Sequence, residues 1–374
     1  MTASTASSPV QSAGPPAYSG ARTEDDKALL RAAAELTRDI STAKPHIYWS
    51  DMLLSAAVGY AALAGAILAP ALWQTIALGV ISTLALYRAL LFIHELTHLH
   101  RNALPGFRTT WNLLVGIPML TPSFMYEDGH TIHHSRKRYG TRDDPEYLPL
   151  ALMKPWSLPL FVLIALLAPI GLVLRFGVLA PLGLFIPALR RANWARFSTL
   201  AINPEFRRRP ADPQNRRRFA WLEAGAALWG MALIASVFVI GWQPLVVALA
   251  IFSAVAVLNQ LRTLVAHLWE NEGEAMSVTA QYLDTANVPP PGWIAALWAP
   301  VGLRFHALHH LLPSLPYHSL GEAHRRLTAH EAASVTYGKA HYRGMAPLIG
   351  RIASSTMRGR PQQAEPAGDT VQAS

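Results

Sequence analysis

Residues 74–93 read QTIALGVISTLALYRALLFI, and this apolar stretch runs directly into HELTH at residues 94–98. About 20 apolar residues are enough for a helix to cross a bilayer. On such a helix His94 and His98 lie one turn apart on the same face, where both rings can reach one ligand. The sequence therefore predicts a helical membrane protein with a metal-binding pattern at the end of a span.

Three further apolar stretches predict further spans. They cover residues 52–69, 219–240 and 245–265. Short uncharged linkers at residues 70–73 and 241–243 join the stretches into two hairpins, and each linker carries a tryptophan, a residue typical of the membrane–water interface. The predicted fold is all-α and polytopic, with four transmembrane helices in two hairpins.

A fifth apolar region, residues 156–189, contains Arg175 and four prolines. Irregular backbone at membrane depth needs protein or water around it, so we expect two interfacial or re-entrant half-helices here. Residues 111–120 are too short to cross, and we expect them at the interface. The prolines of the fifth region are Pro159, Pro169, Pro181 and Pro187.

The composition fits a membrane protein. Of the 374 residues, 51% are hydrophobic and 15% are charged, whereas a soluble protein carries about 25% charged residues. The net charge is +9, yet the sequence contains nothing typical of a nucleic-acid module. The basic runs all fall on one side of the predicted spans, so the positive-inside rule predicts that both termini and every histidine cluster are cytoplasmic. These runs contain Arg136, Lys137, Arg138, Arg190, Arg191, Arg207, Arg208, Arg209, Arg216, Arg217, Arg218, Arg325 and Arg326.

The chain contains no cysteine, which excludes disulfides, thiolate zinc sites, cysteine-held iron–sulfur clusters and thiol nucleophiles. The first twenty residues lack the basic and apolar regions of a signal peptide. We expect a disordered N-terminal arm over residues 1–45, a single membrane domain over residues 46–357 and a disordered tail over residues 358–374.

Two more histidine clusters follow HELTH: HTIHH at residues 130–134 and HALHH at residues 306–310. Spacing of i, i+3 and i+4 places the three imidazoles of each cluster on one helix face. Such nitrogens suit Fe, Zn, Cu or Ni. Eight clustered imidazoles exceed what one ion needs, structural zinc usually includes cysteine, and the Glu-rich helices of ferritin-like sites are missing. The pattern therefore predicts a two-iron site rich in imidazole.

One isolated histidine joins these clusters as a candidate ligand. His267 ends the fourth predicted span at the same depth that His94 has after the second. A single histidine there would ordinarily be an interfacial side chain, but the parallel with His94 favours a ligand role. His100 follows the first cluster closely and points to another face, so we leave it out of the site.

The clusters and their surroundings resemble the membrane fatty acid desaturase family, in a bacterial branch. The resemblance rests on the order of the histidine boxes and on YGTRDDPEYLPL (residues 139–150), LRTLVAHLWENEG (residues 261–273) and GLRFHALHHLLPSLPYHS (residues 302–319), and it covers roughly residues 50–327. It implies a cytoplasmic helical cap that holds two irons, in the inner membrane of a bacterium. The implied ligands are His94, His98, His130, His133, His134, His267, His306, His309 and His310.

The resemblance also raises the question of a tenth position. In acyl-CoA relatives this is an Asn four residues before the lone histidine, acting through water; here the position is Thr263, with Asn259 one turn earlier. Carboxylates should orient the imidazoles by accepting their free ring N–H, and among the candidates we favour Asp128 and Asp144. The full set of candidate carboxylates is Glu95, Glu127, Asp128, Asp143, Asp144, Glu270 and Asp284.

The resemblance implies O2-dependent desaturation of a fatty acyl chain, as part of lipid metabolism. The acyl group could be carried by CoA, a carrier protein or a lipid, and the electrons would come from a separate carrier such as a ferredoxin or cytochrome. A fatty acyl or alkane hydroxylase of the same superfamily is the alternative. A non-catalytic metal-binding or transport protein is a third reading, but it predicts ionisable residues along the spans, where few occur.

Overall fold

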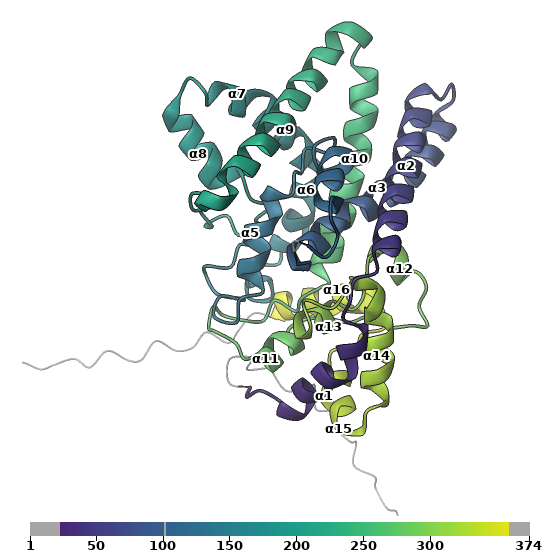
Figure 1. Ribbon diagram of the computed structural model, residues 1–374, viewed down its shortest axis with the longest axis vertical. Coiled ribbons are helices and arrows are strands. Elements are labelled where there is room, and N and C mark those ends of the chain that lie inside the picture. Colours follow the sequence, from purple (N-terminus) through teal and green to yellow (C-terminus); the bar gives the residue numbers. More distant parts are fainter. Residues whose placement is uncertain (1–22, 101, 359–374) are drawn as a thin grey trace, which may run out of the picture.

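The computed structural model describes residues 23–100 and 102–358 of the chain. The regular elements of these residues are helices, and the β pairing among them is limited to isolated bridges. Long helices gather at one end of the molecule, and short helices form a cap at the other end (Figure 1). The predicted all-α class is therefore confirmed, and so is the membrane character that its long apolar helices indicate.

The described residues contain five long apolar helices that could cross a membrane, one more than the sequence predicts. They are α2 (Pro45–Leu68), α3 (Leu72–His98), α6 with its extension to α7 (Ser157–Leu182), α9 (Pro213–Ile240) and α10 (Gln243–Leu264). The two predicted hairpins, α2–α3 and α9–α10, are both present. The orientation of these helices relative to the cytoplasm stays a prediction.

The expectation of two half-helices in residues 156–189 is wrong in its first part. Helix α6 (Ser157–Leu174) passes without a break through Pro169 and the π-helical turn η5 (Arg175–Leu179) into α7 (Ala180–Leu182). Only α8 (Pro187–Phe197) stands apart as a short separate helix. A proline removes one backbone hydrogen bond, and neighbouring helices can compensate for it within a membrane helix.

Arg175 is tolerated inside this long helix because its charge is paired. Its guanidinium donates to Glu223 of α9 at 2.7 Å and to the Ser198 hydroxyl at 2.7 Å. The side chain is 3% exposed, and a charge this deeply buried requires such partners. Arg175, whose charge seemed incompatible with a membrane span, therefore links the turn η5 to α9 through its contact with Glu223.

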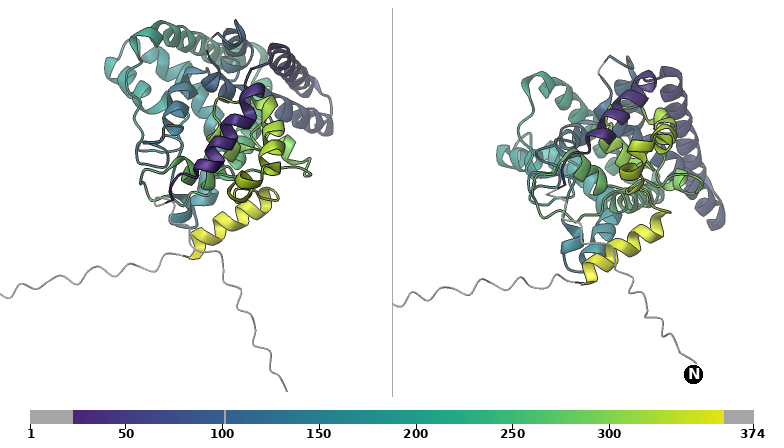
Figure 2. Two further views of the ribbon diagram at one scale, coloured as in Figure 1. Left: turned by 60° about the horizontal axis from the view of Figure 1, so that its bottom comes forward. Right: turned by 90° about the horizontal axis from the view of Figure 1, so that it is seen from below.

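The expected disordered arm is also wrong over the part that the structure describes. Helix α1 (Lys27–Thr37) is capped by Asp26, whose carboxylate accepts from the backbone N–H groups of Ala28 and Leu29. The Leu29 N–H and the Thr336 hydroxyl hold the pKa of Asp26 below its usual value. Helix α1 packs beside α14 (Leu320–Ala329) in the cap (Figure 2). Residues 1–22 and 359–374 lie outside the described part of the chain.

Short helices build the cap and its junction with the spans. Residues 111–120 begin in α4 and form the π-helical turn η3, which the Trp111 indole ties to the Ala89 carbonyl of α3 at 2.8 Å. The remaining elements are η2 (Arg38–Ile40), α4 (Phe107–Trp111), η3 (Asn112–Gly116), α5 (Phe124–His133), η4 (Leu150–Leu152), α11 (Val278–Leu283), α12 (Ala295–Trp298), α13 (His306–Leu311), η6 (Tyr317–Ser319), α15 (Glu331–Gly338) and α16 (Met345–Arg358).

Two glycines let α9 approach the turn η5 closely. A Cβ on Gly230 would lie 2.8 Å from the backbone nitrogen of Gly177, and a Cβ on Gly177 would lie 2.9 Å from the Gly230 carbonyl oxygen. Backbone atoms cannot move aside as a flexible side chain can. This contact therefore fixes the position of the long apolar helix against α9.

Gly230→Ala should lower the thermal unfolding midpoint of the detergent-solubilised protein, since overpacking of this kind costs about 1–3 kcal/mol. Gly171→Ala is the matched control in α6, because nothing lies within 4 Å of its Cβ position. The control should match the wild type or slightly exceed it, because alanine favours a helix. Equal midpoints for the two variants would refute the close approach of α9 and η5.

Candidate metal centre

The three histidine boxes and His267 arrive from four separate parts of the chain. Helix α3 ends at His98 and supplies the first box, α5 supplies the second and α13 supplies the third. His267 follows the end of α10, in a segment held to Thr285 by an isolated β bridge. Histidines from the ends of two long apolar helices thus meet histidines from two short helices of the cap.

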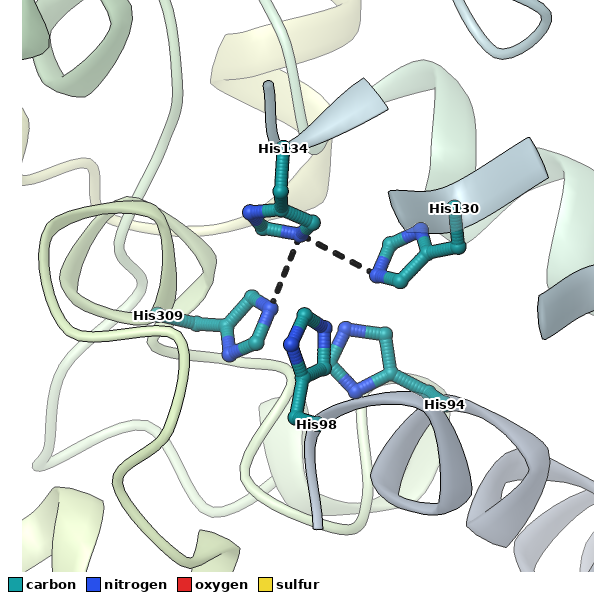
Figure 3. A group of neighbouring side chains, drawn as sticks. All are labelled: His94, His98, His130, His134 and His309. Carbon is teal, nitrogen blue, oxygen red and sulfur yellow. Dashed lines mark hydrogen bonds between the residues drawn. The ribbon is translucent and has the colours of Figure 1, made fainter. Parts of the chain in front are cut away.

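The nine predicted histidines form two groups, in each of which one ring nitrogen from every histidine lies within 4.8 Å of the others. The first group is His94, His98, His130, His134 and His309 (Figure 3). The second group is His133, His267, His306 and His310. His100 belongs to neither group, as the sequence predicts.

Helix geometry explains why one box serves both groups. Each residue turns the helix by about 100°, so positions i+3 and i+4 lie on opposite sides of position i. In α5 the i and i+4 residues, His130 and His134, enter the first group, and the i+3 residue, His133, enters the second. In α13 the i and i+4 residues enter the second group and the i+3 residue, His309, enters the first. The HxxHH spacing therefore divides each box between two neighbouring sites.

The nitrogen separations fit ligands around a common ion. In the first group the Nε2 atom of His134 lies 3.1 Å from the Nε2 atoms of both His130 and His309 (Figure 3). In the second group the Nε2 atom of His306 lies 3.1 Å from that of His267 and 3.2 Å from that of His310. Ligands at right angles around an ion, each at about 2.1 Å, are about 3.0 Å apart.

Buried nitrogens without partners point the same way. The Nε2 atoms of His94 and His98 are buried and have no hydrogen-bond partner among the described residues. A buried polar atom left unpaired is destabilising, and a bound cation between the rings would satisfy both. The donor set therefore fits a pair of transition-metal ions.

Burial also keeps the cap imidazoles in the form that binds metals. It lowers the pKa of six of them well below the ordinary value, and neighbouring rings add to the effect. A neutral imidazole offers a lone pair to a cation. His133 is the exception, because the Asp144 carboxylate outweighs burial and raises its pKa. The six are His130, His134, His267, His306, His309 and His310.

Two carboxylates hold rings of the second box. The Nδ1 atom of His133 lies 2.9 Å from Asp144, which is fully buried and also accepts from two backbone N–H groups. The Nδ1 atom of His130 lies 3.1 Å from Glu146. An ionised carboxylate only accepts, so a ring that faces one carries its proton on Nδ1 and leaves Nε2 free for a metal. Burial raises the pKa of Glu146 to about 7, and in its ionised form Glu146 accepts from His130 in this way. We predicted Asp144 and missed Glu146, which follows Asp144 by two residues in DDPEY.

A tyrosine serves His267 in place of a carboxylate. The Tyr139 hydroxyl lies 2.9 Å from the Nδ1 atom of His267 and donates to Asp284 at 2.8 Å. Since its one proton goes to Asp284, its oxygen accepts the Nδ1–H of His267. Tyr147 donates to the same carboxylate at 2.9 Å, and burial raises the pKa of Asp284 to about 7. Asp284 therefore acts through Tyr139, a residue that spacing arguments did not reveal.

Four other candidate carboxylates make no hydrogen bond to a histidine of either group in the described chain. Asp128 pairs with Arg208 at 2.6 Å, and Asp143 is exposed. Glu127 binds Arg108 and Arg218, and Glu270 binds Arg351. A fifth, Glu95, approaches the Nδ1 atom of His94 at 3.6 Å.

The two candidates for the tenth position have another partner. The Arg262 guanidinium donates to the Asn259 side-chain oxygen at 3.2 Å and to the Thr263 hydroxyl at 3.0 Å. Arg262 itself is buried at the cap end of α10. Both side chains therefore hold this arginine in the structure.

This site defines a class of protein: a membrane oxidoreductase with two buried histidine groups, which are consistent with a di-iron centre. The sequence pattern of the fatty acid desaturase family matches residues 70–341, and the chain belongs to that family. A ceramide hydroxylase from Caulobacter vibrioides (strain NA1000 / CB15N) is 48% identical over 340 residues, which cover 89% of this chain and 95% of the relative.

Asp144→Asn should weaken iron binding by about 10–100-fold, because an uncharged amide no longer stabilises the imidazole that faces the metal. Titration of the protein with a competing chelator, followed by iron analysis, measures the change. Asp143→Asn is the matched control, since this neighbour is exposed, and it should behave like the wild type. An Asp144→Asn protein that retains iron as well as the control would remove Asp144 from the site.

Tyr139→Phe should shift the reduction potential of the centre and weaken its iron binding, because the Nδ1–H of His267 loses its acceptor. Redox titration of the iron-loaded protein checks the potential. Tyr147→Phe removes a hydroxyl from the same carboxylate and leaves the contact between Tyr139 and His267 in place, so its shift should be smaller. A larger shift in Tyr147→Phe would contradict the role of Tyr139.

Proposed function

We propose that this protein hydroxylates a long-chain lipid of the ceramide class. The observation that carries the proposal is the 48% identity to a ceramide hydroxylase over nearly the whole length of both chains. In the proposed reaction a C–H bond of the lipid becomes C–OH, and the second oxygen atom of O2 leaves as water. The balance requires two electrons and two protons from outside the substrate.

The relative favours hydroxylation over the desaturation implied by the family resemblance. Both reactions begin by breaking an unactivated C–H bond, and both suit the same histidine ligands. They differ in whether the carbon gains oxygen or its neighbour loses a second hydrogen. A ceramide carries its acyl chain by an amide within the bilayer, so this substrate would need neither CoA nor a carrier protein.

Two irons held by the nine histidines would supply the O2-reducing chemistry when bound. The surrounding residues orient the imidazole rings, and burial keeps most of them neutral and shields them from water. Asp144, Glu146 and Tyr139 accept the Nδ1–H groups of three rings and fix their direction. Seven of the nine histidines are buried, which limits the access of water to the reaction.

The position of the centre suits a lipid substrate. His94 and His98 lie at the last turn of α3, and His267 follows the end of α10. Both are among the long apolar helices, so the site lies where the spans meet the cap. A centre at this boundary suits a substrate that lies in the membrane.

Incubation of the purified protein with a ceramide, labelled oxygen gas and a reducing system tests the proposal. We expect a product that gains one labelled oxygen atom, detected by mass spectrometry. A product that only loses two hydrogens would overturn hydroxylation in favour of desaturation. Iron content without any product from ceramide or fatty acyl lipids would favour a non-catalytic role.

Two histidine variants serve as controls in the same assay. His309→Ala should lose iron and product together, because His309 contacts His94, His98 and His134 in the first group. His100→Ala should retain both, because this histidine lies outside both groups.

A further inference from the structure

A surface cleft of about 490 Å³ lies beside the metal centre. One wall is the outer side of α5, where Gly129 and Ile132 line the cleft. The segment 205–210 and the loop residues Arg138 and Arg142 also line it. Nine of the fifteen residues that line it are charged, a lining that suits water better than lipid.

The cleft and the histidine groups share α5 as a common wall. Gly129 and Ile132 line the cleft, whereas their immediate neighbours His130 and His133 enter the two metal groups. An α-helix with its side chains is about 10 Å across. A redox group seated in the cleft would therefore be separated from the metal centre by about one helix.

Hydrogen bonds connect the same two sites. The Asn203 side-chain amide donates to the backbone carbonyls of Arg142 and Asp144, both at 3.1 Å. Arg142 lines the cleft, and the Asp144 carboxylate holds His133. A short bonded path thus runs from the edge of the cleft to a ring of the second group.

Five arginines and four carboxylates line the cleft, which gives the lining a net charge of +1. Arg138, Arg207 and Arg209 line it and have no carboxylate partner in the described residues. Arg208 is buried against Asp128. The Arg142–Glu205 pair is largely exposed, so it contributes little to stability. Two unpaired carboxylates, Asp143 and Asp212, also line the cleft, while exposed basic residues flank it at Lys137, Arg216 and Arg217.

We propose that this cleft docks a small acidic one-electron carrier protein that reduces the metal centre. The proposal rests on the proposed function, because hydroxylation consumes two electrons per turnover. The chain contains no cysteine and so holds no cysteine-ligated iron–sulfur cluster that could store them. Positive charge at the rim steers an acidic partner, and the shared wall brings the partner close to the metals.

Charge reversal at the rim tests the docking site, with an acidic [2Fe–2S] ferredoxin as the probe. The test variant is Arg207→Glu/Arg209→Glu, and both side chains are exposed. A second variant, Arg207→Gln/Arg209→Gln, removes the charge but keeps hydrogen-bond donors, since Arg207 donates to the carbonyls of Pro204 and Phe206. The matched control is Arg190→Glu/Arg191→Glu on α8, which reverses two exposed charges outside the cleft.

We expect the KM for reduced ferredoxin to rise about tenfold in the charge-reversed variant and about threefold in the neutral one. The wild-type KM should rise with ionic strength, and this dependence should weaken in both variants. The control should stay within about twofold of the wild type. The proposal would be overturned if the KM for ferredoxin rose as much in the control as in the cleft variants. An unchanged KM in the charge-reversed cleft variant would also overturn it.

Dithionite separates the docking site from the proposed function. With this chemical reductant the charge-reversed variant should form as much hydroxylated ceramide in a single turnover as the wild type. Equal loss of product with dithionite and with ferredoxin would show that the cleft serves the fold or binds anionic lipid, which overturns docking. Absence of product from the wild type with dithionite refutes the hydroxylase, whereas ferredoxin binding measured directly still tests the cleft.

Discussion

The gathering of nine imidazoles in one place, seven of them buried, is the constraint on which the rest of this structure depends. Each ring brings two polar nitrogens into a region that excludes water, and an unpaired buried nitrogen is costly. Three of the rings have a hydrogen-bond acceptor for their Nδ1–H group. The acceptors are Asp144, Glu146 and Tyr139. On the other side the Nε2 atoms converge within hydrogen-bonding distance of one another. A shared cation would satisfy these converging lone pairs, so the histidine groups that the fold brings together are consistent with a di-iron centre.

Helix periodicity revealed the eight histidines of the three boxes, because it aligns positions i, i+3 and i+4. The ninth, His267, was predicted from its place at the end of a span. Periodicity did not reveal how the boxes divide, since that requires knowing that α5 and α13 face each other across two sites. Nor did it identify the hydroxyl group that contacts the Nδ1 atom of His267, because that hydroxyl belongs to Tyr139, 128 residues away in the chain. Asp128 shows the converse error: it precedes His130 by two residues, but its side chain leaves the site for Arg208. Proximity in sequence is a weak guide to the partner of a ring nitrogen.

The errors in the fold have a common physical origin. Pro169 and Arg175 argued against a span, and the irregular composition before residue 46 argued for a disordered arm. Both arguments treat a segment as if it stood alone. The structure places Arg175 against Glu223 and Ser198, and it places α1 against the cap with Asp26 as its N-cap. In both segments, contacts with other parts of the chain stabilise a helix that the local sequence alone does not predict.

Helix α5 connects the chemistry to the surface of the molecule. Its histidines face the metal groups, while Gly129 and Ile132 face the cleft. A Cβ on Gly129 would lie 2.9 Å from the Thr199 methyl group, so the glycine lets the segment that begins at Thr199 lie directly on the helix. That segment continues through Asn203, which binds the Asp144 backbone, to the arginines at the rim. One close contact thus holds the arginines of the rim against the outer side of the helix whose histidines enter the two groups, so the proposed electron route crosses about one helix diameter.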